Sequence, residues 1–390
     1  MPRMIWNLKG SGKNLRSQCV FPTDDLLNLS KTALVHDYLN QRGGAERVFA
    51  HIAQAYPLSP IYTSLYDENL NADLIPGHDV HMSWLSNIPG ANKYFRALAP
   101  LYPAAFEAFD FSEYDTIVSS TTAWAKGIRV PPGAVHVCYI NTVSRFLFAY
   151  DEYVGGFGMR TLGRPVIERL IKWDRKAALR PTAYIANSQN VADRIKQYYG
   201  RDSYVLHCPV DIDRFTVGTG DGGYFIVASR LLSYKRIDLA IKAAQMAGVK
   251  LLVAGRGPAE AELRALAERS TATILGYVPD ADLNRLLGGA TAAILPGSED
   301  FGLVPLEANA SGRPVVAYNG GGARETVIAG TTGQFFDEQT PESLAAVLRS
   351  FDARRFDPQA LRKHAERSSP ANFISRLRAI VEQVRAATRP

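Results

Sequence analysis

The stretch AAILPGSEDFGLVPLEA, which runs from Ala292 to Ala308, decides the fold. Its apolar start, Ala292–Leu295, predicts a buried strand, and the residues from Gly302 onward predict a helix. Gly302 lets the backbone approach a ligand closely, and Pro305 suits the first turn of a helix. Because the free amides at a helix start attract negative charge, this strand-to-helix turn is a candidate anion site.

The same alternation of apolar runs and helical patterns extends from this stretch to both ends of the chain. Strands that alternate with helices form parallel sheets, so we expect an α/β fold. In the second half the expected strands are Tyr224–Ala228, Lys250–Ala254, Thr273–Leu275, Ala292–Leu295 and Pro314–Ala317, with helices starting near Ile237, Ala259, Asp280, Gly302 and Ala323. In the first half we expect strands Ala33–His36, Ile61–Leu65, Thr116–Ser119, Val135–Ile140, Ala183–Asn187 and Tyr204–His207, and helices Gly44–Ala55, Asn92–Phe109, Pro165–Leu179 and Val191–Tyr199.

One glycine-rich stretch interrupts this rhythm and divides the chain. Between Pro209 and Gly223 there are four glycines and no apolar periodicity, which is typical of a linker. The chain has 390 residues, too many for one typical α/β core and about right for two. We therefore expect an N-terminal extension (1–30), a first domain (31–210), a second domain (222–370) and a last helix (371–388).

Composition narrows the class of protein. Hydrophobic residues make up 46% of the chain and charged residues 21%, and no apolar run is long enough to span a bilayer. Residues 1–30 lack the basic start and apolar core of a secretory signal. Three scattered cysteines argue against a disulfide framework or a zinc site, so we expect a cytoplasmic protein. The net charge of +6 favours anionic partners, and no motif supports binding to nucleic acid.

Two carboxylates and two cations fall on the expected ligand-binding edge of the second domain. Glu299 precedes the helix and Glu307 lies inside it, and a carboxylate at this edge suits sugar hydroxyls. Arg230 and Lys235 follow the first strand of the same domain, where two cations suit a diphosphate that leaves with negative charge. The plainer alternatives are residues that stabilise a helix end and a solvated basic loop.

Two glycine loops lie at other strand ends. Gly43 and Gly44 open a helix after the first strand, as a phosphate or sugar site would, although a tight turn explains the pair equally well. Gly255-Arg256-Gly257 is a second strand-to-helix turn. It lacks the full dinucleotide fingerprint, which argues against NAD binding.

Glu299 and Glu307, separated by seven residues and preceded by Arg230 and Lys235, resemble the family-four retaining glycosyltransferases. The resemblance covers roughly Thr32 to the C-terminus and implies the GT-B architecture, two facing Rossmann-like domains. It implies that Arg230 and Lys235 hold the donor diphosphate and that the last helix crosses back to the first domain. It further implies that Glu299 contacts the donor sugar, Glu307 the ribose and Val278 the base, that Phe301, Gly302 and Leu303 offer backbone amides, and that Gly43 and Gly44 face the donor.

One position departs from the family pattern. The segment Tyr139–Phe146 resembles a family segment that usually carries His where Asn141 stands and Pro where Val143 stands. The family's His contacts the reacting sugar. Asn141 can donate and accept hydrogen bonds but cannot become cationic, so we expect its contact with the donor sugar to differ in detail from that of the family's His.

The family transfers sugars without a bound metal, and we expect no metal or cofactor here beyond the nucleotide sugar itself. Asp211-Ile212-Asp213 has the form of a metal-binding Asp-x-Asp motif, but it begins the interdomain linker. The stretch His36–Val48 resembles mannosyltransferases of exopolysaccharide and O-antigen assembly. It implies GDP-mannose as donor and a glycan linked to polyprenyl diphosphate as acceptor.

The segment from Trp84 to Phe109 interleaves aromatic and basic residues along a helical stripe. It fits either an interfacial helix, with peripheral attachment to the cytoplasmic face of an anionic membrane, or an amphipathic helix packed on its own sheet. Two other functions also stay open. One is a nucleotide-sugar isomerase or epimerase of similar shape, and the other is a non-catalytic partner that binds nucleotide sugar.

Overall fold

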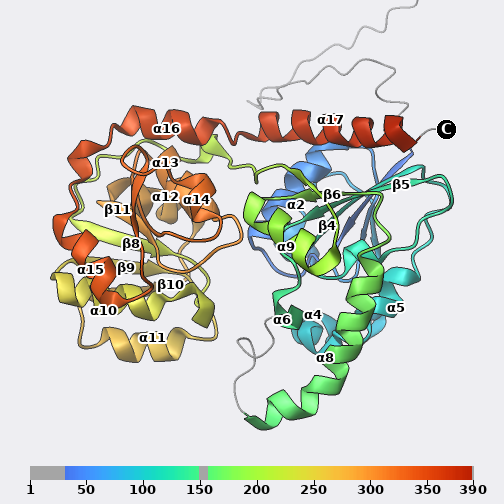
Figure 1. Cartoon of the computed structure of the whole chain (residues 1–390), viewed down its shortest axis with the longest axis horizontal. Coiled ribbons are helices and arrows are strands. Elements are labelled where there is room, and N and C mark those ends of the chain that lie inside the picture. Colours follow the sequence, from blue (N-terminus) through green and yellow to red (C-terminus); the bar gives the residue numbers. More distant parts are fainter. Residues whose placement is uncertain (1–30, 149–156, 389–390) are drawn as a thin grey trace, which may run out of the picture.

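The computed structural model describes residues 31–148 and 157–388, so the expected extension 1–30 lies outside the described residues. Two α/β domains stand side by side (Figure 1). The first holds a parallel sheet of seven strands in the order β3-β2-β1-β4-β5-β6-β7. The second holds a parallel sheet of six strands in the order β10-β9-β8-β11-β12-β13. The α/β fold class with two parallel sheets is confirmed.

In the N-terminal domain the strands are β1 (Thr32–His36), β2 (Ile61–Thr63), β3 (Val80–Met82), β4 (Thr116–Thr121), β5 (Val135–Ile140), β6 (Ala183–Ala186) and β7 (Tyr204–Val205). Its helices are α2 (Gly44–Ala55), α3 (Glu68–Asn71), α4 (Ala91–Tyr94), α5 (Tyr102–Glu107), α6 (Arg145–Phe148), α8 (Phe157–Ala177) and α9 (Gln189–Tyr199), with 3₁₀ turns η1 (Trp84–Asn87), η2 (Phe95–Leu98) and η3 (Ala125–Gly127).

In the C-terminal domain the strands are β8 (Tyr224–Ala228), β9 (Lys250–Ala254), β10 (Ala272–Gly276), β11 (Ala292–Leu295), β12 (Val315–Tyr318) and β13 (Gly333–Phe336). The helices are α10 (Ile237–Ala247), α11 (Glu260–Ala267), α12 (Asp280–Gly289), α13 (Leu303–Ala310), α14 (Ala323–Thr326), α15 (Pro341–Ser350) and α16 (Pro358–Glu366). Three 3₁₀ turns, η4 (Ile212–Arg214), η5 (Ser233–Lys235) and η6 (Ala353–Arg355), and the last helix α17 (Pro370–Thr388) complete the described chain.

The prediction of one helix over Asn92–Phe109 is wrong. The segment forms α4, the 3₁₀ turn η2 and the separate helix α5. Two prolines explain the break, because Pro100 has no amide to donate and Pro103 lies in the first turn of α5. Strands β3 and β13 and helices α15 and α16 were not expected from the sequence. Both strands lie at sheet edges and are short, so they carry little apolar pattern.

The glycine-rich stretch between the domains is docked rather than free. Val210 and Phe215 are buried, and the amides of Gly220 and Gly222 donate to the carbonyls of Gly288 and Gly289 at the end of α12. A Cβ atom at Gly218 would lie 2.2 Å from the carbonyl oxygen of Gly288. The glycines therefore allow one backbone to pack directly on another.

The last helix joins the two domains. Helix α17 runs along the N-terminal domain (Figure 1), where Arg378 donates to the carbonyl of Ala55 at 2.8 Å and the Phe373 ring meets the Tyr139 ring of β5. Its apolar face, which includes Leu377 and Val381, is buried. A helix that follows the second domain in sequence thus completes the core of the first.

Candidate active site

The order of the strands in each sheet indicates where a ligand site is expected. In each sheet the order reverses beside the first strand, between β1 and β4 in one domain and between β8 and β11 in the other. Ligands bind at such switch points, outside the carboxyl ends of the strands. A cavity of about 930 Å³ is lined there by residues of both domains.

Every candidate residue named from the sequence lines this cavity. From the C-terminal domain come Arg230, Lys235, Val278, Glu299, Phe301, Gly302, Leu303 and Glu307, and from the N-terminal domain Gly43, Gly44 and Asn141. The structure therefore brings together groups that lie up to 264 residues apart in the sequence, from Gly43 to Glu307.

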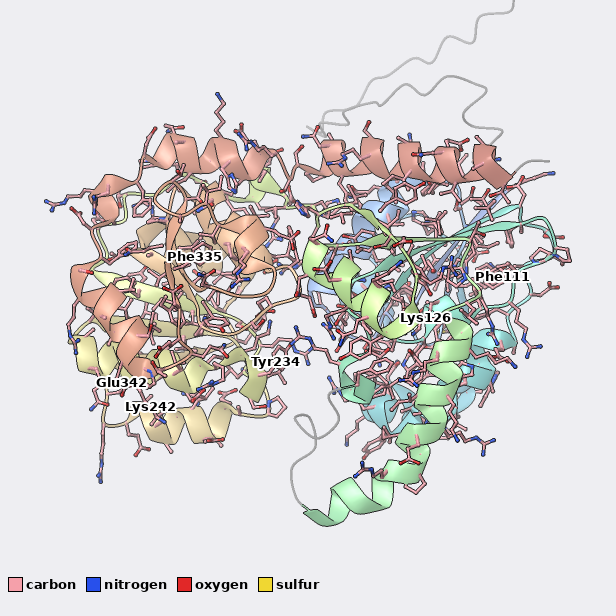
Figure 2. All side chains as sticks on the ribbon, in the orientation of Figure 1. Phe111, Lys126, Tyr234, Lys242, Phe335 and Glu342 are labelled. Atoms are coloured by element: carbon pink, nitrogen blue, oxygen red, sulfur yellow. The ribbon has the colours of Figure 1, made fainter. Side chains whose placement is uncertain are left out.

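The loop after β8 that carries Arg230 and Lys235 (residues 229–236, the cation loop) meets the loop after β11 that carries Glu299 and Asp300 (residues 296–302, the acidic loop). The Lys235 ammonium pairs with Oε1 of Glu299, and both side chains are largely buried. Gly297 makes this contact possible, because a Cβ there would lie 2.8 Å from the carbonyl oxygen of Tyr234. Tyr234 itself lies on the side of its domain that faces the N-terminal domain (Figure 2).

The turn into α13 has the geometry of an anion site. Gly302 precedes the helix with φ of 88°, a conformation that a side chain disfavours, and the buried Phe301 packs near His207. The first amides of α13 start at the cavity wall, where Gly302 and Leu303 both lie.

Glu307 reaches the opposite domain from inside α13. Its carboxylate lies 3.7 Å from Arg47 of α2, and Arg47 pairs at 3.0 Å with Asp280, which also pairs with Arg214. Burial raises the pKa of Glu307, and Arg47 and Arg214 offset part of the rise. The residue expected to meet a ribose thus also meets a cation of the N-terminal domain.

The glycine pair lies across the cleft from α13. The amide of Gly43 donates to the Glu46 carboxylate at 2.8 Å, so this amide is already used. A Cβ at Gly44 would lie 3.3 Å from Cδ1 of Leu303, so the two domains come close together at this point. The pair therefore sets how near α2 approaches α13.

Asn141 lies at the end of β5 and is almost fully buried. Its amide nitrogen donates to the Ser120 hydroxyl at 2.9 Å and to the Thr121 carbonyl at 3.4 Å. The amide oxygen is therefore the atom left to accept a hydrogen bond from a ligand in the cavity.

Sequence reasoning missed several residues that shape the cavity. Asp37, buried at the end of β1, accepts hydrogen bonds from the hydroxyls of Thr121 and Thr122 and from the amides of residues 122–125. This carboxylate fixes the loop after β4, which supplies three residues to the cavity wall. A single aspartate next to a strand gives no signal of such a role in sequence.

The aromatic segment, which the sequence left open between an interfacial helix and a helix packed on its own sheet, serves mainly as core. Phe95, Tyr102 and Phe106 are buried against the N-terminal sheet. Trp84 and Tyr94 are 42% and 59% exposed, so part of the segment still faces outward. Over residues 31–148 and 157–388, no helix is long and apolar enough to cross a membrane.

Within the same described ranges, no group of three or more His, Cys, Asp or Glu side chains is arranged to hold a metal ion. Asp211 directly precedes the 3₁₀ turn η4 at the docked linker, and Asp213 lies inside it. The expectation of metal-free chemistry stays a prediction.

Comparison with known proteins agrees with this geometry. Residues 42–214 match the family described as Glycosyltransferase Family 4, and residues 211–368 match Glycosyl transferases group 1. Each match covers less than half of the chain, and the two fall on the two domains described above. Together the two matches extend from the glycine pair to the end of α16, so they include both walls of the cavity.

Curated proteins also match part of the chain. The chain is 29% identical to a D-inositol 3-phosphate glycosyltransferase of Geodermatophilus obscurus, over 44% of this chain and 45% of that protein. It is 33% identical to the glycogen synthase of Pseudomonas paraeruginosa, over 36% of this chain and 29% of that enzyme. The chain therefore spans less than half the length of these curated relatives.

Solved structures show the GT-B fold over most of the chain. Anabaena HepE in complex with UDP matches with a TM-score of 0.67 at 19% identity, covering 90% of this chain and all of that one. Sucrose-phosphate synthase from Thermosynechococcus elongatus matches with a TM-score of 0.68 at 17% identity, covering 91% and 99%. The GT-B architecture predicted from the sequence is confirmed.

Proposed function

We propose that this protein is a retaining glycosyltransferase that moves a sugar from a nucleoside diphosphate donor to an acceptor held against the N-terminal domain. The contact between Lys235 and Glu299 carries the proposal. It joins a cation suited to the leaving diphosphate to an acid suited to the sugar hydroxyls, with Arg230 on the same wall.

The charges of the cavity support an internal-return mechanism, in which the leaving phosphate accepts the proton of the acceptor. Each carboxylate in its lining has a partner: Glu46 the Gly43 amide, Asp280 and Glu307 the Arg47 guanidinium, Glu299 the Lys235 ammonium, and Asp300 two arginines. None of them is held as a free nucleophile for a covalent intermediate.

In this mechanism the bond between the anomeric carbon and the phosphate oxygen breaks as the acceptor oxygen bonds to the same face of the sugar. The departing phosphate takes the acceptor's proton. Arg230 and Lys235 stabilise the charge that develops on the phosphate, and the amides at the start of α13 face the same charge.

For the donor we propose GDP-mannose, and for the acceptor a glycan on polyprenyl diphosphate, with the enzyme on the cytoplasmic face of a membrane. The support is the resemblance of residues 36–48 to bacterial mannosyltransferases of polysaccharide assembly.

The exposed Trp84 and Tyr94 beside Lys93 give a surface that suits a membrane interface. Release from membranes by high salt, but not by low salt, is the expected fractionation result. Full solubility at low salt would contradict the membrane part.

A thermal-shift panel of nucleotide sugars tests the donor, because a ligand that binds the native state raises Tm. We expect GDP-mannose to raise Tm more than UDP-glucose, which one HepE structure contains. Transfer to a membrane lipid extract should give a product with the donor's anomeric configuration, read by NMR. Lys235→Ala should lower kcat about 100- to 1,000-fold, the range seen when a group that stabilises developing charge is removed.

The same assay separates the rival functions. A changed sugar formed without any acceptor would identify an isomerase or epimerase. A protein that binds the donor but transfers no sugar, and whose donor affinity is unchanged by Lys235→Ala, would be a non-catalytic binding partner. Inversion of the anomeric configuration would contradict the retaining mechanism.

A further inference from the structure

Asp300 of the acidic loop is held by two arginines of the other domain. Its Oδ1 atom lies 2.9 Å from Arg145 of α6 and 2.5 Å from Arg194 of α9. All three side chains are between 18% and 20% exposed, so solvent and salt screen these pairs less than pairs on the open surface. The loop that carries Glu299 is thus tied across the domain boundary.

The backbone of this loop is tied across the same boundary. The Ser188 hydroxyl donates to the carbonyl of Asp300 at 2.7 Å, and the Asn190 amide donates to the carbonyls of Asp300 and Glu299 at 3.3 and 3.4 Å. In return, Glu325 of the C-terminal domain accepts from the amides of residues 189 and 190 at the start of α9. The N-terminus of α9 and the acidic loop therefore hold each other.

Each arginine also touches a second part of the cavity wall. Arg194 donates to the carbonyl of Val143 at 3.2 Å, in the loop that begins with Asn141. Arg145 lies over the ring of Tyr234, 5.0 Å from its centroid, next to Lys235. The Asp300 contacts therefore connect the sugar-facing loop of one domain to the cation and acid loops of the other.

We propose that Arg194 and Arg145, acting through Asp300, are positioning residues that set the acidic loop in its working geometry when the two domains meet. The proposal rests on the proposed function and names a requirement within it. Glu299 adjoins Asp300 in the chain, so a shift of the Asp300 carboxylate moves the sugar-binding acid and its contact with Lys235. A displacement of about 1 Å at a reacting group can cost about 100-fold in rate.

Arg194 is the better test residue, because it is not among the residues that line the cavity and so acts on a ligand only through its neighbours. We expect Arg194→Gln to lower kcat about 100-fold while the donor Kd stays within about three-fold. Arg194→Lys keeps the charge and should recover part of the rate. Lys196→Gln, on the same helix as Arg194, is the matched control, since it removes only an exposed ion pair with Asp202 and should leave kcat unchanged.

Coupling to Asp300 gives the second measurement. If Arg194 acts through Asp300, the double variant Arg194→Gln/Asp300→Asn should be no slower than the Asp300→Asn single variant. Independent, multiplying losses would overturn the proposal, and so would a kcat for Arg194→Gln within two-fold of the wild type. Thermal melts of each variant check folding. If Asp300→Asn is unfolded, the kcat values of Arg194→Gln and Arg194→Lys test the proposal without the double variant.

Hydrogen exchange separates this proposal from the proposed function. Should the wild type bind no nucleotide sugar, the proposed function fails, yet the ligand-free protein still tests the contacts. We expect faster exchange over residues 297–303 in Arg194→Gln than in Lys196→Gln. Equal exchange in the two variants would overturn the positioning role.

Discussion

Gly44 and Leu303 face each other across the cleft, one from each domain, and a Cβ atom at Gly44 would lie 3.3 Å from Cδ1 of Leu303, a tight contact. We expect Gly44→Val to hold the cleft open and to lower transfer at least about 10-fold, because the near-attack geometry is lost. The double variant Gly44→Val/Leu303→Ala removes the opposing methyl groups and should regain most of the rate. A double variant as slow as Gly44→Val alone would show that closure is not the cause.

Glu307 gives a residue-scale prediction for pH. Its pKa is raised above the ordinary value of 4.5, so the folded state holds the proton more tightly than the unfolded state. The stability that protonation supplies is therefore present below that value and is lost as pH rises through the folded pKa. Glu307→Gln cannot lose a proton at this position. The unfolding free energy of the variant, relative to that of the wild type, should therefore be higher at about pH 7 than at about pH 4.

Denaturant unfolding at the two pH values measures this shift. Glu342→Gln is the matched control, because Glu342 is exposed on α15, at the surface of the same domain (Figure 2). A shift of equal size in both variants would show that the burial of Glu307 is not responsible.

At the residue scale, the sequence predicted the site residues that directly follow a strand. It missed the residues whose contacts form only where the two domains meet. Arg230, Lys235 and Glu299 each follow a strand, and parallel strands bring their carboxyl ends to one edge. The contacts of Asp300 with Arg145 and Arg194 join positions more than 100 residues apart in different domains. No local pattern carries that information.

At the scale of elements, the loop after β4 depends on the carboxylate of Asp37. Its six donors include four backbone amides, and hydrogen bonds to a charged acceptor are stronger than neutral ones. We expect Asp37→Asn to lower the unfolding free energy by about 3 kcal/mol, measured by denaturant unfolding. Asp73→Asn breaks an exposed pair with Arg42 and should cost less than about 1 kcal/mol. Equal losses would contradict the role of Asp37.

Elements were predicted well where apolar runs were long and poorly where prolines or sheet edges intervened. Gly44–Ala55 and Tyr224–Ala228 have in the structure the bounds expected from the sequence. The segment 92–109 has a continuous helical stripe, yet Pro100 and Pro103 divide it. The stripe describes burial only in part, because Phe95, Tyr102 and Phe106 are buried whereas Leu101 is 38% exposed.

At the scale of the whole molecule, α17 makes the N-terminal domain depend on the last residues of the described chain. Leu377 is fully buried between α17 and the N-terminal domain, and Leu→Ala at such a site costs about 2–5 kcal/mol. We expect Leu377→Ala to speed hydrogen exchange in α2 and β5, which lie more than 200 residues earlier in the chain, while α10 and α15 keep their protection. Faster exchange in α10 and α15 instead would contradict this arrangement.

The overall architecture could be predicted because it follows from alternation alone. Apolar runs separated by helices specify parallel sheets, and a glycine-rich stretch marks a change of domain. What the alternation does not specify is how the two sheets face each other. That depends on the docked linker and on α17, whose apolar stripe fits more than one surface.

The two places where the chain passes between the domains are joined to each other. The amide of Val210, on the outward passage, donates to the carbonyl of Ser368, on the return passage, at 2.8 Å. This hydrogen bond holds the two crossings side by side, so both lie close to one point between the domains. We therefore expect any opening of the cleft to be a rotation about this point, in which the rim of the cleft moves far and the residues next to Val210 hardly at all.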